Sequence, residues 1–145
     1  MLAKYYRLRM QWVADQTLTY NNDARIAIRL SPWKLVSGVL TYGTTITEDL
    51  GFGSGETIAN NGEVEGSVID NTSNVYYGIK GYFEITADAN STDGTAYLFI
   101  EESDDNSNWP SDQADFDVDI DLRLIATLTF STDAVDESRG TNFEF

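Results

Sequence analysis

Oxygen-bearing side chains crowd the segment 104–115, densely enough to suggest a site for a hard cation. Ca²⁺ prefers oxygen ligands, and a calcium-binding loop supplies them at set positions along about twelve residues. Candidate ligands fall at relative positions 1, 3, 5, 9 and 12 of this segment: Asp104, Asn106, Asn108, Asp112 and Asp115. Trp109 stands at position 6, where an EF-hand needs glycine, Pro110 follows it, and no helix pattern flanks the loop. An EF-hand is therefore excluded. The open alternatives are an irregular Ca²⁺ site and a solvated acidic loop whose Trp109 packs onto the protein.

A ladder of carboxylates follows, with an acid at every second position: Asp115, Asp117, Asp119 and Asp121. The residues between them are apolar. A strand points successive side chains to opposite faces, so this alternation predicts a strand from Phe116 to Phe130 with one acidic face. Four like charges on one face repel one another unless they are paired or hydrated. They either meet a basic surface on a neighbouring subunit or keep the strand from pairing with other chains.

Residue types that carry much enzyme chemistry are missing. The chain has no cysteine and no histidine, which excludes thiol nucleophiles, Cys/His zinc sites and Ser-His-Asp triads. Carboxylate-pair glycoside hydrolysis needs two positioned acids, and Glu101 and Glu102 are adjacent. Adjacent strand residues point to opposite faces, however, so these two cannot act together. We therefore expect no enzymatic activity, no catalytic residue and no cofactor.

Positive charge is concentrated in the first 34 residues, which carry net +4 within a chain of net −15. Four arginines lie on the polar faces of two alternating segments and are the predicted partner-binding residues: Arg7, Arg9, Arg25 and Arg29. They could meet an acidic partner or a second copy of the chain; the alternative is a solvated surface with a chance imbalance of charge. The remaining body is acidic and would be repelled by nucleic acid and by an anionic membrane, so neither is expected as a partner. The sequence also shows no apolar stretch of about 18 residues, which predicts no membrane span.

Short segments of strand-like pattern, separated by turn signals, run along the chain. The expected strands are Lys4–Val13, Arg25–Leu30, Lys34–Tyr42, Thr44–Leu50, Glu63–Asp70, Val75–Thr86, Tyr97–Ile100 and Phe116–Phe130. Pro32 is expected to break the pattern, and Gly38 to mark a bulge inside its strand. The pattern predicts an all-β fold: one antiparallel β-sandwich over residues 1–145, jelly-roll-like, with about eight strands.

Three segments have patterns known from other proteins: Gly66–Tyr76, Tyr97–Trp109 and Leu124–Phe130. The first is similar to an Asn-Ser-Thr-Asn lead-in to a strand, the second to a Ser-x-Asp-Gly-x-x-Trp/Tyr turn, and the third to a Leu-Ile-Gly-Thr strand. Through these segments roughly half of the chain resembles small structural proteins of tailed-bacteriophage virions. Asn106 stands where the turn has glycine. The resemblance implies a β-sandwich located in the virion, in the role of a capsid decoration or cement subunit.

The sequence is compatible with three functions. The first is a homo-oligomeric virion subunit that binds the major capsid protein or another virion protein. The second is a carbohydrate-binding or host-adhesion module of a tail or fibre, because aromatic side chains could form a platform for sugars: Tyr5, Trp12, Trp33, Tyr76, Tyr82 and Trp109. The third is a secreted module stabilised by Ca²⁺, which would lose thermal stability in EDTA.

Overall fold

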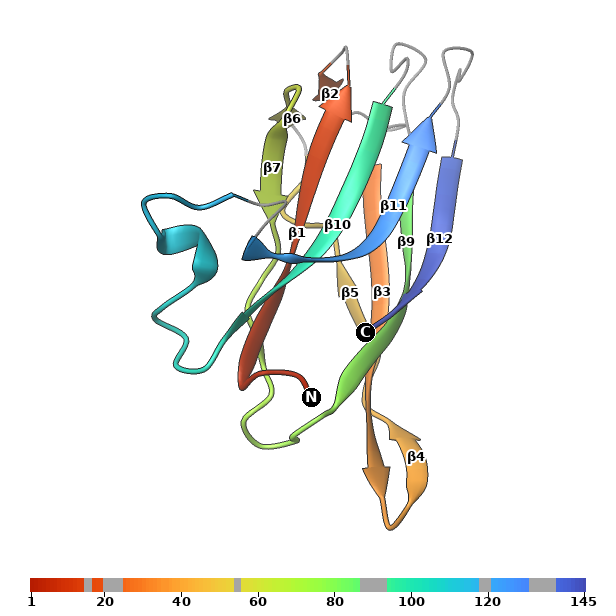
Figure 1. Ribbon diagram of the computed structural model, residues 1–145. Coiled ribbons are helices and arrows are strands. Elements are labelled where there is room, and N and C mark those ends of the chain that lie inside the picture. The colour runs from red at the N-terminus through yellow and green to blue at the C-terminus, as the bar shows by residue number, and fades with distance from the viewer. Residues whose placement is uncertain (15–16, 20–24, 54–55, 87–93, 118–120, 131–137) are drawn as a thin grey trace.

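The computed structural model describes residues 1–14, 17–19, 25–53, 56–86, 94–117, 121–130 and 138–145 (Figure 1). Its strands form two antiparallel five-stranded sheets packed face to face. The β1 sheet runs in the order β11 (Arg123–Phe130), β10 (Gly94–Ser103), β1 (Tyr5–Ala14) and β7 (Gly62–Glu65), with β8 (Ile69–Asp70) also on β1. The β3 sheet runs in the order β12 (Ser138–Glu144), β9 (Gly78–Thr86), β3 (Arg25–Val36) and β4 (Val39–Tyr42), with β5 (Ile46–Glu48) also on β3. A small pair, β2 (Leu18–Thr19) and β6 (Thr57–Ile58), and a 3-10 turn at Pro110–Asp112 complete the described elements.

The core lies between the two sheets, where the period-2 pattern of the sequence places it. Along β1 every second side chain is buried: Tyr6, Leu8, Met10 and Trp12 are at most 1% exposed. The facing strand β3 buries Ile26, Ile28 and Leu30 in the same way. The predicted all-β antiparallel sandwich is confirmed, while its jelly-roll connectivity stays a prediction. None of the described segments contains a helix long and apolar enough to span a membrane.

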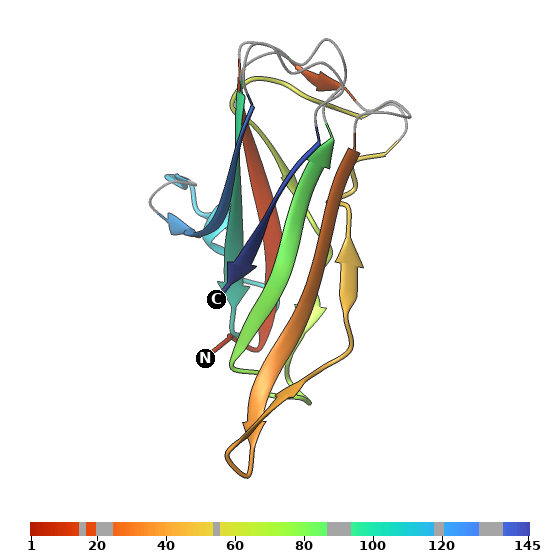
Figure 2. The same ribbon diagram turned by 90° about the vertical axis from the view of Figure 1, so that its right-hand side faces the viewer.

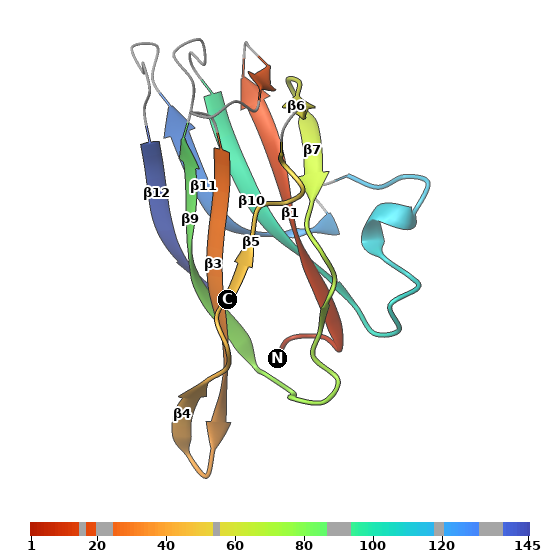
Figure 3. The same cartoon turned by 180° about the vertical axis from the view of Figure 1, so that it is seen from behind.

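The segment Lys34–Tyr42 was predicted as one strand with a bulge, and this is wrong. Ser37 and Gly38 both have positive φ, 52° and 81°, and reverse the chain. Val36 and Val39 therefore pair across a two-residue turn, as in the tight hairpins that suit twisted strands. Val39–Tyr42 form β4, which returns antiparallel to β3 and projects past the end of the sandwich (Figures 1 and 3).

Pro32 does not break its strand, contrary to the prediction. It lies inside β3, between the stretch that pairs with β5 and the stretch that pairs with β4. The Pro32 carbonyl accepts a hydrogen bond from Gly43 N–H at 2.7 Å, and this bond needs no amide hydrogen from proline. A proline is tolerated here because the strand changes its neighbour at this point.

The carboxylate ladder is also not a strand where the structure describes it. Strand β11 begins only at Arg123, and Asp117 lies in a loop. Asp117 N–H donates to the Asp121 carboxylate at 2.8 Å, and Asp121 N–H donates back to the Asp117 carbonyl at 2.8 Å. Asp119 lies outside the described residues. The pairing of β11 with β10 starts at Arg123, opposite Ile100, and among the described residues Asp115, Asp117 and Asp121 pair with no strand, so the alternation there does not form one.

A second, smaller apolar cluster lies on the outer face of the β1 sheet. Phe99 and Leu122 are buried there, and Tyr97 and Phe116 pack against them. The register between β10 and β11 shifts next to Phe99, which leaves an extra residue in β11. Phe116 and Leu122 thus cover part of a sheet face that would otherwise meet water.

Candidate interaction surfaces

Two of the four predicted arginines lie on the outer face of the β1 sheet, opposite acids of the neighbouring strands. Arg7 is the cross-strand partner of Glu101 on β10. Arg9 is the cross-strand partner of Glu65 on β7. Opposite charges that face each other across strands attract, so the sheet register brings these residues into contact. We call this group, with Glu63, the arginine–glutamate cluster.

The arginine–glutamate cluster is tightly connected. Arg7 Nε donates to Glu101 Oε2 at 2.6 Å, and Arg7 Nη1 lies 3.2 Å from Glu65 Oε1. Arg9 Nη1 lies 3.0 Å from Glu63 Oε2, and Arg9 Nη2 lies 3.5 Å from Glu101 Oε2. Both arginine side chains are only about a tenth exposed, and the Glu101 side chain is fully buried. The two guanidinium groups therefore already have carboxylate partners inside the chain.

The acidic loop closes over this cluster. Its Ser111 N–H donates to Glu101 Oε1 at 2.8 Å, and Arg7 Nη2 donates to Ser111 Oγ at 2.9 Å. The Trp109 ring lies under the Arg7 guanidinium, 4.4 Å from ring centre to Cζ, and Trp109 is buried. Arg9 stacks in the same way on Phe116 at 5.5 Å. Cation–π contacts of this kind are stronger where water is excluded.

Glu101 is held in its charged form by these contacts. Burial alone would raise its pKa, but hydrogen bonds from Arg7 and Ser111 and the charge of Arg7 outweigh burial, so the pKa is lowered. The neighbouring Glu102 points elsewhere and accepts the Ala3 N–H at 2.8 Å. Because Glu101 stays ionised and both of its oxygens are engaged, the Glu101–Glu102 pair is not arranged for acid–base chemistry.

The predicted partner-binding arginines thus divide into two groups. Arg7 and Arg9 pair with the glutamates of the arginine–glutamate cluster and lie beneath the acidic loop. Arg25 and Arg29 lie on the exposed outer face of the β3 sheet, and within the described part of the chain neither forms an ion pair. Sheet packing places the two pairs on opposite sides of the sandwich, so they do not form one basic patch. Binding of a partner by any of the four stays a prediction.

The acidic loop is organised around Asp105. Its Oδ1 accepts the N–H groups of Ser107 and Asn108, each at 2.9 Å, and its Oδ2 accepts the Asn108 amide at 2.6 Å. Ser103 Oγ donates to the Asn108 carbonyl at 2.8 Å. These bonds fix a turn in which Asn106 adopts a φ of 60°, a conformation that asparagine tolerates better than most residues. Asn106 therefore replaces the expected glycine without losing the turn.

The five calcium candidates are all exposed. Two of them already have partners within the loop: Asn108 donates to Asp105, and Asp112 accepts the Trp109 N–H at 3.1 Å. Among the described residues no three acidic side chains are grouped as a metal would need. The packed Trp109 matches the alternative of a solvated acidic loop whose tryptophan anchors it. An irregular Ca²⁺ site stays a prediction, which the melting temperature in EDTA tests.

Protonation of Asp105 is expected to occur only in strong acid. Hydrogen bonds from the Ser107 N–H and from the side chain and N–H of Asn108 lower the pKa of Asp105 to about 2. A carboxylate with a lowered pKa keeps its hydrogen bonds until the pH falls through that value. The amide resonances of Ser107 and Asn108, followed by NMR, should therefore titrate with a midpoint near pH 2. Asp104→Asn is the matched control and should leave the midpoint unchanged, whereas a midpoint near pH 4 would contradict the turn.

The β3–β4 hairpin is the most apolar exposed surface that the structure describes. Its exposed large side chains are Leu35, Val36, Val39, Leu40 and Tyr42, and Val39 is 65% exposed. Single exposed apolar residues are ordinary, but a contiguous group marks a surface for another molecule. The hairpin projects from the sandwich rather than covering it (Figures 2 and 3). Sequence analysis missed this surface because the Ser37–Gly38 turn was read as the middle of a strand.

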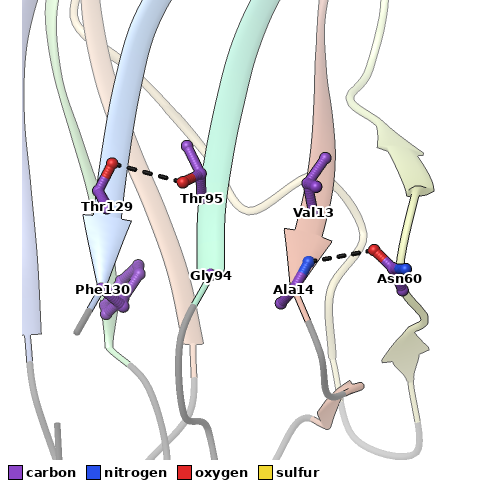
Figure 4. Close-up of a pocket in the computed structure, with 7 residues that line it drawn as sticks. All are labelled: Val13, Ala14, Asn60, Gly94, Thr95, Thr129 and Phe130. Atoms are coloured by element: carbon purple, nitrogen blue, oxygen red, sulfur yellow. Dashed lines mark hydrogen bonds between the residues drawn. The ribbon is translucent and has the colours of Figure 1, made fainter. Parts of the chain in front are cut away.

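One further hollow opens at the end of the β1 sheet, with a volume of about 430 Å³ (Figure 4). It is lined by Val13, Ala14, Asn60, Gly94, Thr95, Thr129 and Phe130. Asn60 accepts the Ala14 N–H at 3.2 Å, and the Thr95 and Thr129 hydroxyl groups lie 3.4 Å apart. None of these seven side chains ionises in the ordinary pH range, so they offer no acid or base for a reaction.

The aromatic residues also separate by location. Trp12 is in the core and Trp109 is beneath Arg7, so neither can stack on a sugar. Tyr82 remains exposed on the outer face of the β3 sheet.

Comparisons with known proteins find no matching family model, no matching curated protein and no matching solved structure. The chain is thus a small all-β protein with two antiparallel sheets, and its resemblance to tailed-phage virion proteins stays a prediction.

Proposed function

We propose that this chain is a non-enzymatic structural subunit of a tailed-phage virion. In this role it decorates the capsid, binding the major capsid protein or another virion protein and copies of itself. The exposed apolar β3–β4 hairpin is the observation that supports a binding role. The resemblance of the Tyr97–Trp109 and Leu124–Phe130 segments supports the virion as its location.

The hairpin is suited to binding by both its side chains and its backbone. Gly43 N–H points toward β3, where it donates to Pro32. Backbone groups alternate in direction along an antiparallel strand, so the N–H and C=O groups of Leu40 and Tyr42 point away from β3. Among the described strands β4 pairs only with β3, so it is an edge strand. A partner strand could add to this edge while apolar side chains supply the affinity.

Charge also favours this surface for assembly. The stretch 35–47 carries no charged residue, in a chain of net −15. Two acidic molecules repel each other least where their contact is neutral. The hairpin is therefore the surface through which copies of this chain, or an acidic partner, could approach.

Replacing the hairpin tip tests this proposal. The double variant Val39→Ser, Leu40→Ser keeps the turn and the strand but removes two exposed apolar side chains. We expect its occupancy on capsid shells of the encoding phage, measured by co-sedimentation, to fall by about tenfold or more, as for the central residues of an interface. Val68→Ser is the matched control, because Val68 is also exposed but lies between β7 and β8, which belong to the β1 sheet. The control should bind like the unaltered protein.

Salt separates the apolar mechanism from an electrostatic one. Binding through the hairpin should persist at high salt, whereas binding through Arg25 and Arg29 should weaken as salt rises. Unchanged occupancy of the double variant would reject the hairpin as the binding surface. Absence of the chain from purified virions, measured by mass spectrometry, would reject the virion assignment itself.

A further inference from the structure

A shallow depression lies on the outer face of the β3 sheet, on the side of the molecule that Figure 2 turns toward the viewer. Its volume is about 440 Å³, and residues of β3, β4, β9 and β12, with Thr45 before β5, line it. Its lining includes the side chains of Arg29, Lys80, Tyr82, Tyr42 and Asn142. All five are exposed to solvent.

The Tyr82 ring lies against the sheet at a place where Gly140 leaves room for it. A Cβ atom at Gly140, on the neighbouring strand β12, would overlap the Tyr82 hydroxyl and ring. The ring therefore occupies the space that a side chain at residue 140 would fill. Tyr82 is still 39% exposed, so part of the ring faces solvent. An aromatic ring lying on a flat sheet can stack on the apolar face of another ring.

Polar groups flank this ring on both sides. Arg29 is the cross-strand partner of Tyr82 on β3, and Asn142 is its cross-strand partner on β12. Lys80 lies two residues before Tyr82, on the same face of β9. The platform thus combines one aromatic ring, one amide and two cations within neighbouring strand positions.

The two cations are unpaired within the described part of the chain. Neither Arg29 nor Lys80 forms an ion pair, side-chain hydrogen bond or aromatic contact there, in contrast to Arg7 and Arg9. Glu144 is the cross-strand partner of Lys80 but forms no ion pair with it, and Glu84 on the same face forms no ion pair with any described cation. Neither acid lines the depression. Two free cations at one place are notable in a chain of net −15.

We infer that this depression binds an anionic saccharide. The sugar ring would stack on Tyr82, its hydroxyl groups would bond to Asn142 and the Tyr42 hydroxyl, and its carboxylate or sulfate would pair with Arg29 and Lys80. The open, shallow form suits a chain of sugars lying along the sheet. An acidic peptide would satisfy the cations but would make no use of the tyrosine ring. This site is separate from the hairpin tip and does not depend on the virion role.

The test is direct binding by the isolated chain. A glycan array should retain glycans that bear uronate, sialate or sulfate groups over their neutral counterparts. The affinity of the best glycan, measured by titration calorimetry, should fall about tenfold in Arg29→Gln, because a charge-assisted hydrogen bond is lost. Tyr82→Leu, which keeps an apolar side chain against Gly140, should also weaken binding. Circular dichroism establishes that each variant is folded.

Arg25→Gln provides the matched control. Arg25 lies on the same face of β3 as Arg29 but outside the depression, so its loss should leave the affinity unchanged. Retention of no anionic glycan would overturn the inference. Equal binding of polyglutamate, or an equal loss of affinity in Arg25→Gln and Arg29→Gln, would also overturn it, since either result indicates a general attraction to negative charge.

Discussion

Replacing Glu101 by glutamine is expected to lower the free energy of unfolding by about 3 kcal/mol, since removing one member of a buried ion pair leaves its partner charges uncompensated. The Glu101 side chain is fully buried and contacts both Arg7 and Arg9. Glutamine keeps the size of the side chain, so the loss reports the charge rather than a cavity. Urea denaturation followed by circular dichroism measures the change.

Glu63→Gln is the matched control for this prediction. Glu63 pairs with Arg9 from the rim of the same cluster, and its side chain is 27% exposed. An ion pair that water reaches contributes little, so this change should cost less than about 1 kcal/mol. Equal effects of the two substitutions would mean that Glu101 is not the buried centre of the cluster.

The dependence on pH gives a second measurement for the same residue. The pKa of Glu101 is lowered in the folded protein, because hydrogen bonds from Arg7 and Ser111 overcome the effect of burial. A lowered carboxyl pKa contributes stability above the unfolded value of about 4.3, and this contribution is lost as the pH falls through the folded value. The gap in stability between the unaltered protein and Glu101→Gln should therefore be widest near neutral pH and should narrow below about pH 4. A gap that stays constant down to pH 3 would contradict this assignment.

Replacing Trp109 by alanine is expected to lower the free energy of unfolding by about 3 kcal/mol, in the range found for deletion of a buried tryptophan side chain. Trp109 is 6% exposed and lies under the Arg7 guanidinium. Its loss opens a cavity and also exposes the Arg7–Glu101 ion pair to water. Urea denaturation measures the stability, and limited proteolysis of the segment 104–117 measures whether the loop has come away from the sheet.

Leu124→Ala is the control for Trp109→Ala. Leu124 is a large apolar residue of β11 but is 48% exposed, so its truncation should change stability by no more than about 0.5 kcal/mol. Because Trp109 and Glu101 both contact Arg7, the double variant should lose less stability than the sum of the two single variants. Unaltered stability of Trp109→Ala would mean that the loop does not cover the cluster in solution.

The arginine–glutamate cluster lies on the outer face of the β1 sheet, whereas both proposed binding surfaces belong to the β3 sheet. The arginine–glutamate cluster uses two of the chain's few cations internally. The cations that remain exposed on the β3 sheet, Arg25, Arg29 and Lys80, have no such partners in the described residues. Internal pairing thus determines which positive charges are left to meet another molecule.

Alternation of apolar and polar residues was sufficient to predict β1, the first half of β3 and β9, and the face of each that is buried. In β1, Tyr6, Leu8, Met10 and Trp12 are all in the core, as a period of two requires. The antiparallel sandwich follows, because two such sheets can bury their apolar faces only against each other. The same pattern misled at Asp115, Asp117 and Asp121, since alternation describes a strand only where a neighbouring strand is present to accept its hydrogen bonds.

Tertiary structure decided which polar residues meet. Arg7 and Glu101 are separated by 94 positions in the chain, and only the register of β1 on β10 makes them partners. The sequence alone determined that Arg7, Arg9, Arg25 and Arg29 lie on polar strand faces. It could not determine that the first two face carboxylates beneath a loop while the last two face solvent, because strand order and register depend on contacts between distant segments. The projection of the hairpin was likewise decided by positive φ angles at Ser37 and Gly38, a reversal of the backbone that the apolar pattern does not reveal.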